Sequence, residues 1–287
     1  MDSLFLPPNT ALATPGWQGS LELRFTPRHG KTQPIHALMQ APLKVQRPFY
    51  PEGSVCHSVV LHTAGGMVGG DRLSQIIHLE PNAHALLTTA SASKVYRSQG
   101  KQARQTIQLQ VDAGACLEWL PQETIIFNGA IYRQDLRVEL APGGSWLGWE
   151  ITRLGRSARG EKFLQGEWRS HTEIWQQGIP LWIDRQWLPA GRDILNSPHG
   201  LAGQPVVASL VWVGQGVSPE IIEKARRLWT ASQGQGEAGV TGLISGLLCR
   251  YRGASTVEVR NWFTEVWQLL RLSLLGRPIT KPRVWQV

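Results

Sequence analysis

The segment with the most distinctive composition runs from His62 to Leu73 and reads HTAGGMVGGDRL, with four glycines in the six positions from 65 to 70. Glycines at such a place permit positive φ or close approach of two chain segments, so we expect the backbone to turn sharply. Asp71 follows this run and can cap a turn, pair with Arg72 or bind a cation. Taken alone, turn capping is the commoner role. A nucleotide site is not indicated, because the segment has no GxGxxG or GK[ST] pattern and no helix-forming stretch after it.

Hydroxyl side chains gather in the segment Leu86–Ser98, which reads LLTTASASKVYRS. Thr and Ser commonly line strand faces and turns, so a solvated strand edge is the simplest interpretation. The alternative is that Thr88, Thr89 and Ser91 belong to the polar lining of an internal passage.

Acidic residues stand out in two further segments. Leu117–Ala130 reads LEWLPQETIIFNGA, and its Glu118 and Glu123 lie five positions apart around a proline, a spacing that does not define an acid/base pair. The segment RLGRSARGEKFLQG, from position 153 to 166, holds several arginines around one acid, Glu161. Pairing of Glu161 with an arginine within a turn is the plain explanation, and such pairs contribute little when they are exposed.

Motifs for catalysis and for tight metal binding are missing from the sequence. It contains no Ser-His-Asp order, HExxH or GxSxG, so we predict that the chain is not an enzyme. The three cysteines, Cys56, Cys116 and Cys249, show no CxxC or CxH spacing. Neither a disulfide framework nor a zinc site is therefore predicted, and a reducing compartment fits best.

The composition favours a mainly β protein, and its charge fits an acidic partner or simply a soluble basic protein equally well. The chain has 287 residues, 42% of them hydrophobic and only 17% charged, with 30 Gly and 18 Pro, a combination that favours many short strands and turns. The net charge of +8 makes nucleic acid, an anionic membrane or an acidic protein surface a plausible partner. The Lys and Arg residues are scattered, with no concentrated run typical of a nucleic-acid-binding arm.

Targeting and membrane segments are not indicated. Met1–Pro15 has an acidic Asp2, two consecutive prolines and no long apolar stretch, so we do not expect a secretory signal. The longest uncharged run spans positions 201 to 219, and its continuous apolar core, Val206–Val213, has the length of a strand. We therefore expect a cytoplasmic protein without a membrane partner.

The spacing of turn residues predicts stacked β-sheets. Leu21–Phe25 reads LELRF, the alternation of a half-buried strand, and clusters of Gly, Pro and Asp interrupt similar runs at short intervals. No fixed repeat period is apparent, so a solenoid is not predicted from the pattern. We expect one elongated domain over residues 1–287, β-rich from 15 to 215 and with helices from 216 to 287.

Two helices are predicted in the C-terminal third. Ser218 and Pro219 are a good N-cap and first helical residue for one of them. Ser255 and Glu258 form a capping box for the second, which should end at Gly276. Trp262 and Trp267 belong to its unusually wide apolar stripe, which could be buried against the sheet and also against a partner.

Taken together, five stretches of the chain resemble the UreD family of urease accessory proteins, also called UreH. The resemblance follows the family's order and spacing over about the first two thirds of the chain. The stretches are LKVQRPFYPEG from position 43, AGGMVGGDRL from 64, LTTASASKVYRS from 87, EWLPQETIIFNGA from 118 and GRSARGEKFLQGEWRS from 155. The tail TKPRVWQV, from Thr280, is similar to the family's basic and aromatic terminus.

The resemblance implies a mainly β scaffold that joins UreF-type and UreG-type partners to apo-urease, oligomeric within that complex, and that assists nickel insertion through an internal passage. It implies that Asp71 and Glu161 line or gate the route as weak, transient nickel ligands, with no tightly bound cofactor. Thr88, Thr89, Ser91 and Glu118 are the expected passage lining. The expected partner interface consists of Trp262, Trp267, Arg283 and Trp285.

The alternative is a basic, β-rich nucleic-acid-binding protein. It is favoured by the net charge and by 13 tryptophans that could stack on bases. Against it, the sequence shows no clustered basic groove with interleaved aromatic residues, so a nucleic-acid partner is not expected.

Overall fold

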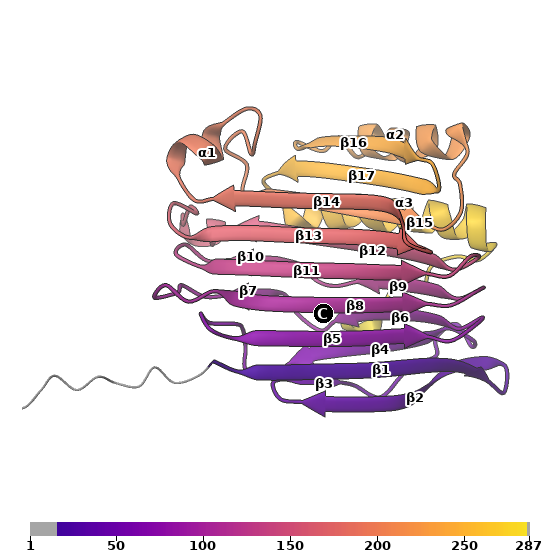
Figure 1. Ribbon diagram of the computed structural model, residues 1–287. Coiled ribbons are helices and arrows are strands. Elements are labelled where there is room, and N and C mark those ends of the chain that lie inside the picture. Colours follow the sequence, from indigo (N-terminus) through magenta and orange to yellow (C-terminus); the bar gives the residue numbers. More distant parts are fainter. Residues whose placement is uncertain (1–15, 286–287) are drawn as a thin grey trace, which may run out of the picture.

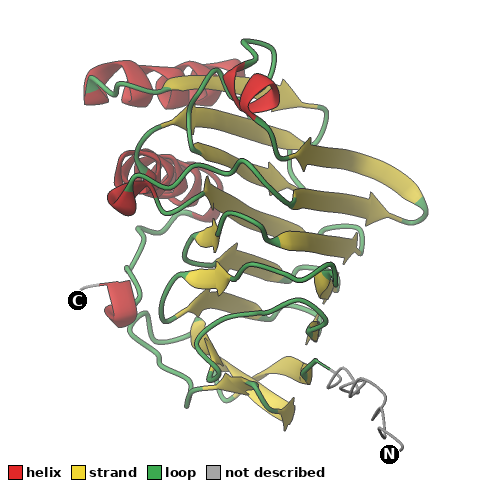
Figure 2. Ribbon diagram, turned by 90° about the vertical axis from the view of Figure 1, so that its left-hand side faces the viewer, coloured by secondary structure: helices red, strands yellow, loops and turns green. Residues whose placement is uncertain are grey.

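The computed structural model describes residues 16–285, so Met1–Pro15 and residues 286–287 lie outside it. Strands dominate the fold and form two sheets that face each other (Figures 1 and 2). The seven-stranded sheet has the order β14-β13-β11-β8-β5-β1-β2. Its strands are β1 (Gln18–Arg28), β2 (Lys31–Gln40), β5 (Arg72–Leu79), β8 (Ala103–Val111), β11 (Ile131–Leu140), β13 (Glu167–Gln176) and β14 (Ile179–Pro189).

The ten-stranded sheet lies behind the first in Figure 1 and has the main order β16-β17-β15-β12-β9-β6-β4-β3, with β7 and β10 attached beside β12. Its strands are β3 (Leu43–Val45), β4 (Cys56–His62), β6 (His84–Thr89), β7 (Ser93–Val95), β9 (Cys116–Leu120), β10 (Thr124–Ile126), β12 (Ser145–Leu154), β15 (Val206–Val213), β16 (Glu237–Leu243) and β17 (Gly246–Gly253). The prediction of a mainly β protein with stacked sheets is confirmed.

The central part of the chain forms solenoid-like coils, which the sequence analysis did not predict. Each coil places one strand in each sheet, in the pairs β4/β5, β6/β8, β9/β11 and β12/β13, and equivalent strands of successive coils are parallel. One end of every coil is a turn of four residues, 80–83, 112–115 and 141–144, whereas the other end is a connection of variable length, 63–71, 90–102, 121–130 and 155–166. This variation removes any fixed period, which explains why no repeat is visible in the sequence.

Three α-helices complete the fold: α1 (Arg192–Asn196), α2 (Pro219–Ser232) and α3 (Thr256–Leu275); two short 3-10 helices span Ser157–Arg159 and Arg283–Trp285. The two helices predicted in the C-terminal third are confirmed, and both pack on the outer side of the ten-stranded sheet (Figure 2). The Ser255 hydroxyl accepts a hydrogen bond from the backbone N–H of Glu258, and Gly276 ends α3 in the left-handed conformation, as the capping motifs indicated. None of the helices in the described part of the chain is both long and apolar enough to span a bilayer.

A buried ion pair joins α3 to the coils. Arg271 is 1% exposed, and its Nε and Nη2 donate to the two carboxylate oxygens of Glu118 on β9 at 2.8 and 2.5 Å. The same guanidinium also contacts Glu52, in the loop before β4. Burial would raise the pKa of Glu118, but the hydrogen bonds from Arg271 and His84 outweigh it and hold this pKa below its usual value. Glu118 is therefore charged in the folded protein, and Arg271 stabilises that charge.

We predict that Arg271→Met destabilises the fold by about 3–5 kcal/mol, because it removes the buried guanidinium that pairs with both Glu118 and Glu52. Urea unfolding monitored by tryptophan fluorescence measures the loss. The matched control is Arg227→Met on the exposed side of α2, which should change stability by less than about 0.5 kcal/mol. Equal effects of the two substitutions would contradict the anchoring role.

Candidate functional site

The space between the sheets holds a polar band toward the variable connections, with mainly apolar rows on both sides of it. Side chains in matching register on β5, β8, β11, β13 and β14 form rows across the inner face of the seven-stranded sheet. The row nearest the variable connections is buried and consists of Ala103, Tyr132, Trp168 and Leu188. The second and third rows carry Gln105, Gln134, Ser170 and Gln186, and Gln75, Thr172 and Asp184. The next row consists of Ile77, Leu109, Val138, Ile174 and Trp182. The apolar rows hold the sheets together, and the polar rows line an internal space.

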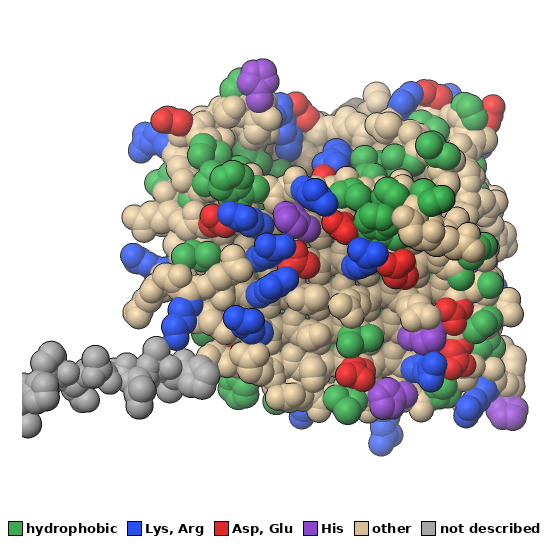
Figure 3. Space-filling view, in the orientation of Figure 1, with side chains coloured by type: hydrophobic (Ala, Val, Ile, Leu, Met, Phe, Trp, Pro, Cys, Tyr) green, Lys and Arg blue, Asp and Glu red, His purple; other side chains and the backbone are tan. Residues whose placement is uncertain are grey.

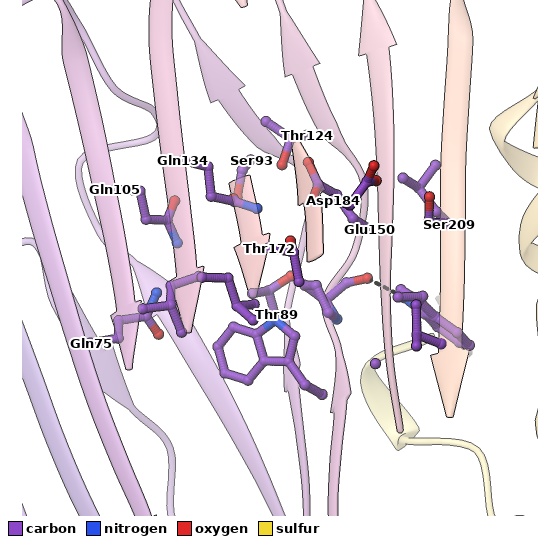
Figure 4. Close-up of a pocket in the computed structure, with 18 of the residues that line it drawn as sticks. Gln75, Thr89, Ser93, Gln105, Thr124, Gln134, Glu150, Thr172, Asp184 and Ser209 are labelled. Atoms are coloured by element: carbon purple, nitrogen blue, oxygen red, sulfur yellow. Dashed lines mark hydrogen bonds between the residues drawn. The ribbon is translucent and has the colours of Figure 1, made fainter. Parts of the chain in front are cut away.

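Three cavities adjoin one another along this polar band. A central cavity of about 60 Å³ lies between the sheets (Figure 4). It shares Gln75, Thr89, Ser93 and Gln105 with a cavity of about 180 Å³ beside β4. On the other side it shares Glu150, Gln186 and Ser209 with a cavity of about 490 Å³ beside β17. The three cavities outline a passage that crosses the coils, roughly perpendicular to the strands, and we call it the polar passage.

Glu150, on β12, is the acid at the junction between the central cavity and the one beside β17. Its carboxylate accepts hydrogen bonds from Ser170 at 2.8 Å and Thr152 at 3.3 Å. Burial raises the pKa of Glu150 to about 7, and the nearby charge of Asp184 adds to this effect. Glu150 can therefore exchange a proton, or a proton for a cation, near neutral pH.

Asp184, on β14, is the second acid of the polar passage, and Figure 4 shows it beside Glu150. It accepts hydrogen bonds from Gln186 at 2.7 Å and from Arg250 at 2.9 Å. Arg250 lies on β17, at the wall of the 490 Å³ cavity. Asp184 thus carries one ion pair, whereas Glu150 is held by hydroxyl groups alone.

Unpaired polar atoms mark the other end of the polar passage. Both ring nitrogens of His62 and the Oε1 of Gln75 are buried without a hydrogen-bond partner among the described residues. Both residues line the 180 Å³ cavity. Burial lowers the pKa of His62, which favours the neutral imidazole, the form that binds metals. No group of three or more His, Cys, Asp or Glu side chains within residues 16–285 is arranged to hold a metal ion.

Asp71 is 1% exposed and caps the glycine-rich turn that the sequence predicted there. Its carboxylate accepts hydrogen bonds from the backbone N–H groups of Val68 and Trp17, both at 2.8 Å. Gly70, just before it, has a φ of 101°, and a Cβ at Gly66 would come within 2.6 Å of Tyr96. Glycine is therefore required at both positions.

Glu161 also holds a turn. Its carboxylate pairs with Arg156 and accepts hydrogen bonds from the backbone N–H groups of Asn128 at 3.0 Å and Arg156 at 3.3 Å. Asp71 and Glu161 lie at the same end of the coils, in the connections before β5 and β13, and two strands separate β5 from β13. The structure does not bring these two carboxylates together in one site.

The predicted lining residues divide between two faces of the ten-stranded sheet. Thr89 lines both the central and the 180 Å³ cavity, and Ser91 lines the latter. Thr88 and Glu118 lie on the helix side, where Thr88 accepts a hydrogen bond from the indole of Trp285 at 3.0 Å and Glu118 one from the indole of Trp267 at 2.6 Å.

The residues predicted for a partner interface differ in exposure. Trp262 and Trp267 are 1% and 0% exposed and pack inside this chain, in the core under α3. Trp285 is half-buried and stacks on Trp149 with ring centroids 5.5 Å apart. Arg283 is exposed, and its guanidinium lies 4.0 Å from the ring centre of Phe49. Its role in a partner interface stays a prediction.

Sequence reasoning missed Glu150, Asp184 and the glutamines of the polar passage. The signal was present in the period-two pattern, because Gln75, Gln105 and Gln134 occupy the same alternation as buried Leu, Ile and Val in their strands. A polar residue in a buried position of a strand indicates an internal polar site.

We predict that Glu150→Gln stabilises the protein above pH 7 by up to about 3 kcal/mol, since a pKa near 7 against an unfolded value near 4.5 means that ionisation of Glu150 disfavours the fold. The gain should shrink as the pH falls from 7 to 4.5 and vanish below it, where Glu150 is protonated in both states. Urea unfolding at pH 5 and pH 8 measures the difference. A gain independent of pH would contradict the assignment.

Comparisons with known proteins identify related chains. The family model described as UreD urease accessory protein matches residues 18–286. A curated relative from Nostoc punctiforme, named urease accessory protein UreD, is 72% identical over 273 residues, 95% of this chain and 97% of the relative. Relatives of the same name from Acaryochloris marina and Synechocystis sp. are 61% and 43% identical and cover 94% and 88% of this chain and 95% of each relative. The chain belongs to the UreD family of urease accessory proteins.

Proposed function

We propose that this chain acts in urease maturation as a non-enzymatic scaffold whose polar passage conducts nickel ions toward apo-urease. The observation that carries this proposal is the row of three neighbouring cavities, which share lining residues and have an acid at the junction of two of them. Nickel is the cargo and is held only in transit. The family relationship supports the urease context, because the relatives are named for it.

The chemistry of the polar passage suits a hydrated, weakly held divalent cation. Its lining offers amide, hydroxyl and carboxylate oxygens, and such ligands bind nickel less tightly than a cluster of thiolates or imidazoles would. The central cavity of about 60 Å³ has room for a few water molecules. A cation could therefore keep part of its water shell while it exchanges ligands along the passage.

Glu150 is the residue on which we place the transfer step. Its pKa near 7 allows the carboxylate to release a proton when a cation arrives and to recover it when the cation leaves. The excess negative charge at this point is limited, because Asp184 is already paired with Arg250. A single mobile carboxylate attracts nickel without trapping it.

The scaffold part of the proposal rests on surfaces outside the polar passage. UreF-type and UreG-type proteins and apo-urease are the proposed partners in the cytoplasm, within an oligomeric complex. The exposed Arg283, next to the half-buried Trp285, is the proposed contact near the C-terminus. The nucleic-acid alternative has no support from the family relationship.

The experiment blocks the polar passage without removing a charge. Ser209 lines both the central cavity and the one beside β17, so Ser209→Leu should fill the junction. In cells that express a urease cluster at limiting nickel, we expect a loss of urease activity and of nickel content of at least about fivefold. Co-purification of the accessory complex should be retained.

The matched control is Ser20→Leu on β1, which lies outside the three cavities and should leave activation unchanged. Full activation by Ser209→Leu at limiting nickel would overturn the passage proposal, whereas loss of the complex in both variants would indicate misfolding.

A separate prediction concerns Asp71 and Glu161. If they act through the turns that they hold, Asp71→Ala and Glu161→Ala should lower the midpoint of thermal unfolding and reduce urease activation at both limiting and excess nickel. If they bind nickel directly, excess nickel should restore activation and the thermal midpoint should stay unchanged. Full activation of both variants at limiting nickel would rule out a role in the route.

A further inference from the structure

The outer face of the seven-stranded sheet carries a row of four arginines in register. Arg72 on β5 aligns with Arg104 on β8, which aligns with Arg133 on β11 and Arg169 on β13. The row ends on β14 at Trp187, which is 60% exposed. Adjacent strands lie about 4.8 Å apart, so the four arginines span roughly 14 Å. We call these five residues the arginine row.

Acids of the chain neutralise only part of the arginine row. Arg104 and Arg133 share one carboxylate, Asp135, at 2.9 and 2.8 Å. Arg169 pairs with Glu167 at 2.5 Å. Arg72 is exposed and forms no ion pair within residues 16–285. The four guanidinium groups therefore face two carboxylates, and the row keeps a net positive charge.

The row is an unfavourable arrangement for an isolated sheet. Like charges directly opposite each other on neighbouring strands destabilise a sheet by some tenths of a kcal/mol per pair. Water and the two acids reduce this cost, and an incoming row of anions would remove it. Arg97, Lys101, Arg159 and Lys162 are also exposed, in the connections at the same end of the coils, and they extend the positive potential. Figure 3 shows basic side chains gathered over this part of the sheet.

We propose that the arginine row is a docking surface for an acidic α-helix of a partner protein. Acids on one face of a helix recur about every 5.4 Å, close to the 4.8 Å spacing of the strands, so three successive turns can meet the four arginines. Arginine binds carboxylates through two parallel hydrogen bonds, which favours a fixed register. Trp187 supplies an apolar anchor at one end of the row.

The surroundings of the row fit a protein better than a nucleic acid. Ile76 and Ile183 are exposed on the same face, four residues along β5 and β14 from Arg72 and Trp187. Single-stranded nucleic acid is bound by aromatic side chains that alternate with basic ones. The arginine row has only one aromatic residue, at its end.

The experiment uses the full-length protein and a synthetic helical peptide. The peptide carries glutamates at positions i, i+4, i+7 and i+11 and a leucine beside the last of them, and fluorescence anisotropy of a labelled peptide measures binding at low salt. A second peptide with Gln at the four positions tests the need for charge. We expect binding of the acidic peptide only, weakening steeply as salt is added.

Variants locate the binding site. Arg72→Gln/Arg104→Gln should weaken peptide binding at least tenfold, and Trp187→Ala several-fold. The control Arg24→Gln/Arg28→Gln changes two arginines of β1 in the same sheet and should bind as the unmodified protein does. Circular dichroism checks that all variants are folded.

Three outcomes would overturn the proposal. The first is no binding of the acidic peptide by the unmodified protein. The second is equal affinity of the two double variants. The third is tighter binding of a labelled thymidine 12-mer than of the peptide, which would identify a nucleic-acid surface. None of these outcomes bears on nickel conduction through the polar passage.

Discussion

The parallel register between successive coils is the constraint on which the rest of the structure depends. Strands of each sheet hydrogen-bond to the equivalent strands of the next coil, without a shift of register from β5 through β8 and β11 to β13. Because the register is kept, residues at equivalent positions of successive strands form a row across the sheet. The polar passage inside and the arginine row outside are such rows. A slip of one residue in one strand would exchange the two faces of that strand and break both.

A polar interior carries a cost in stability, and the fold limits it in two ways. The apolar rows at the four-residue-turn end, with residues such as Ile77 and Leu109 fully or almost fully buried, supply the hydrophobic contact between the sheets. Most polar groups of the passage find partners, as the hydrogen bonds of Ser170 and Thr152 to Glu150 show. The remaining cost is the burial of the ionised Glu150 carboxylate, which its raised pKa reflects. Such a cost at a functional position is common in proteins.

Local signals predicted the parts of the fold that depend on a few neighbouring residues. The N-cap at Ser255, the end of α3 at Gly276 and the glycine turn before Asp71 are examples, because each is decided within one turn of chain. The coils were not predictable in this way, since their variable connections hide the period. Burial of Trp267 and Glu118 depends on Arg271, which lies more than 150 positions from Glu118, and no local pattern reveals such a pair. The site was predicted in part, with Thr89 and Ser91 on its walls and Glu150 missed.

The division between constant turns and variable connections has a consequence for the length of the molecule. Each coil adds one strand spacing, about 4.8 Å, to both sheets. The distance between the two outer cavities is thus set by the number of coils that separate them, and it can change only in whole steps. Substitutions can change the side chains that line the space between these cavities, but they do not change the distance. The number of coils in the chain therefore fixes that distance.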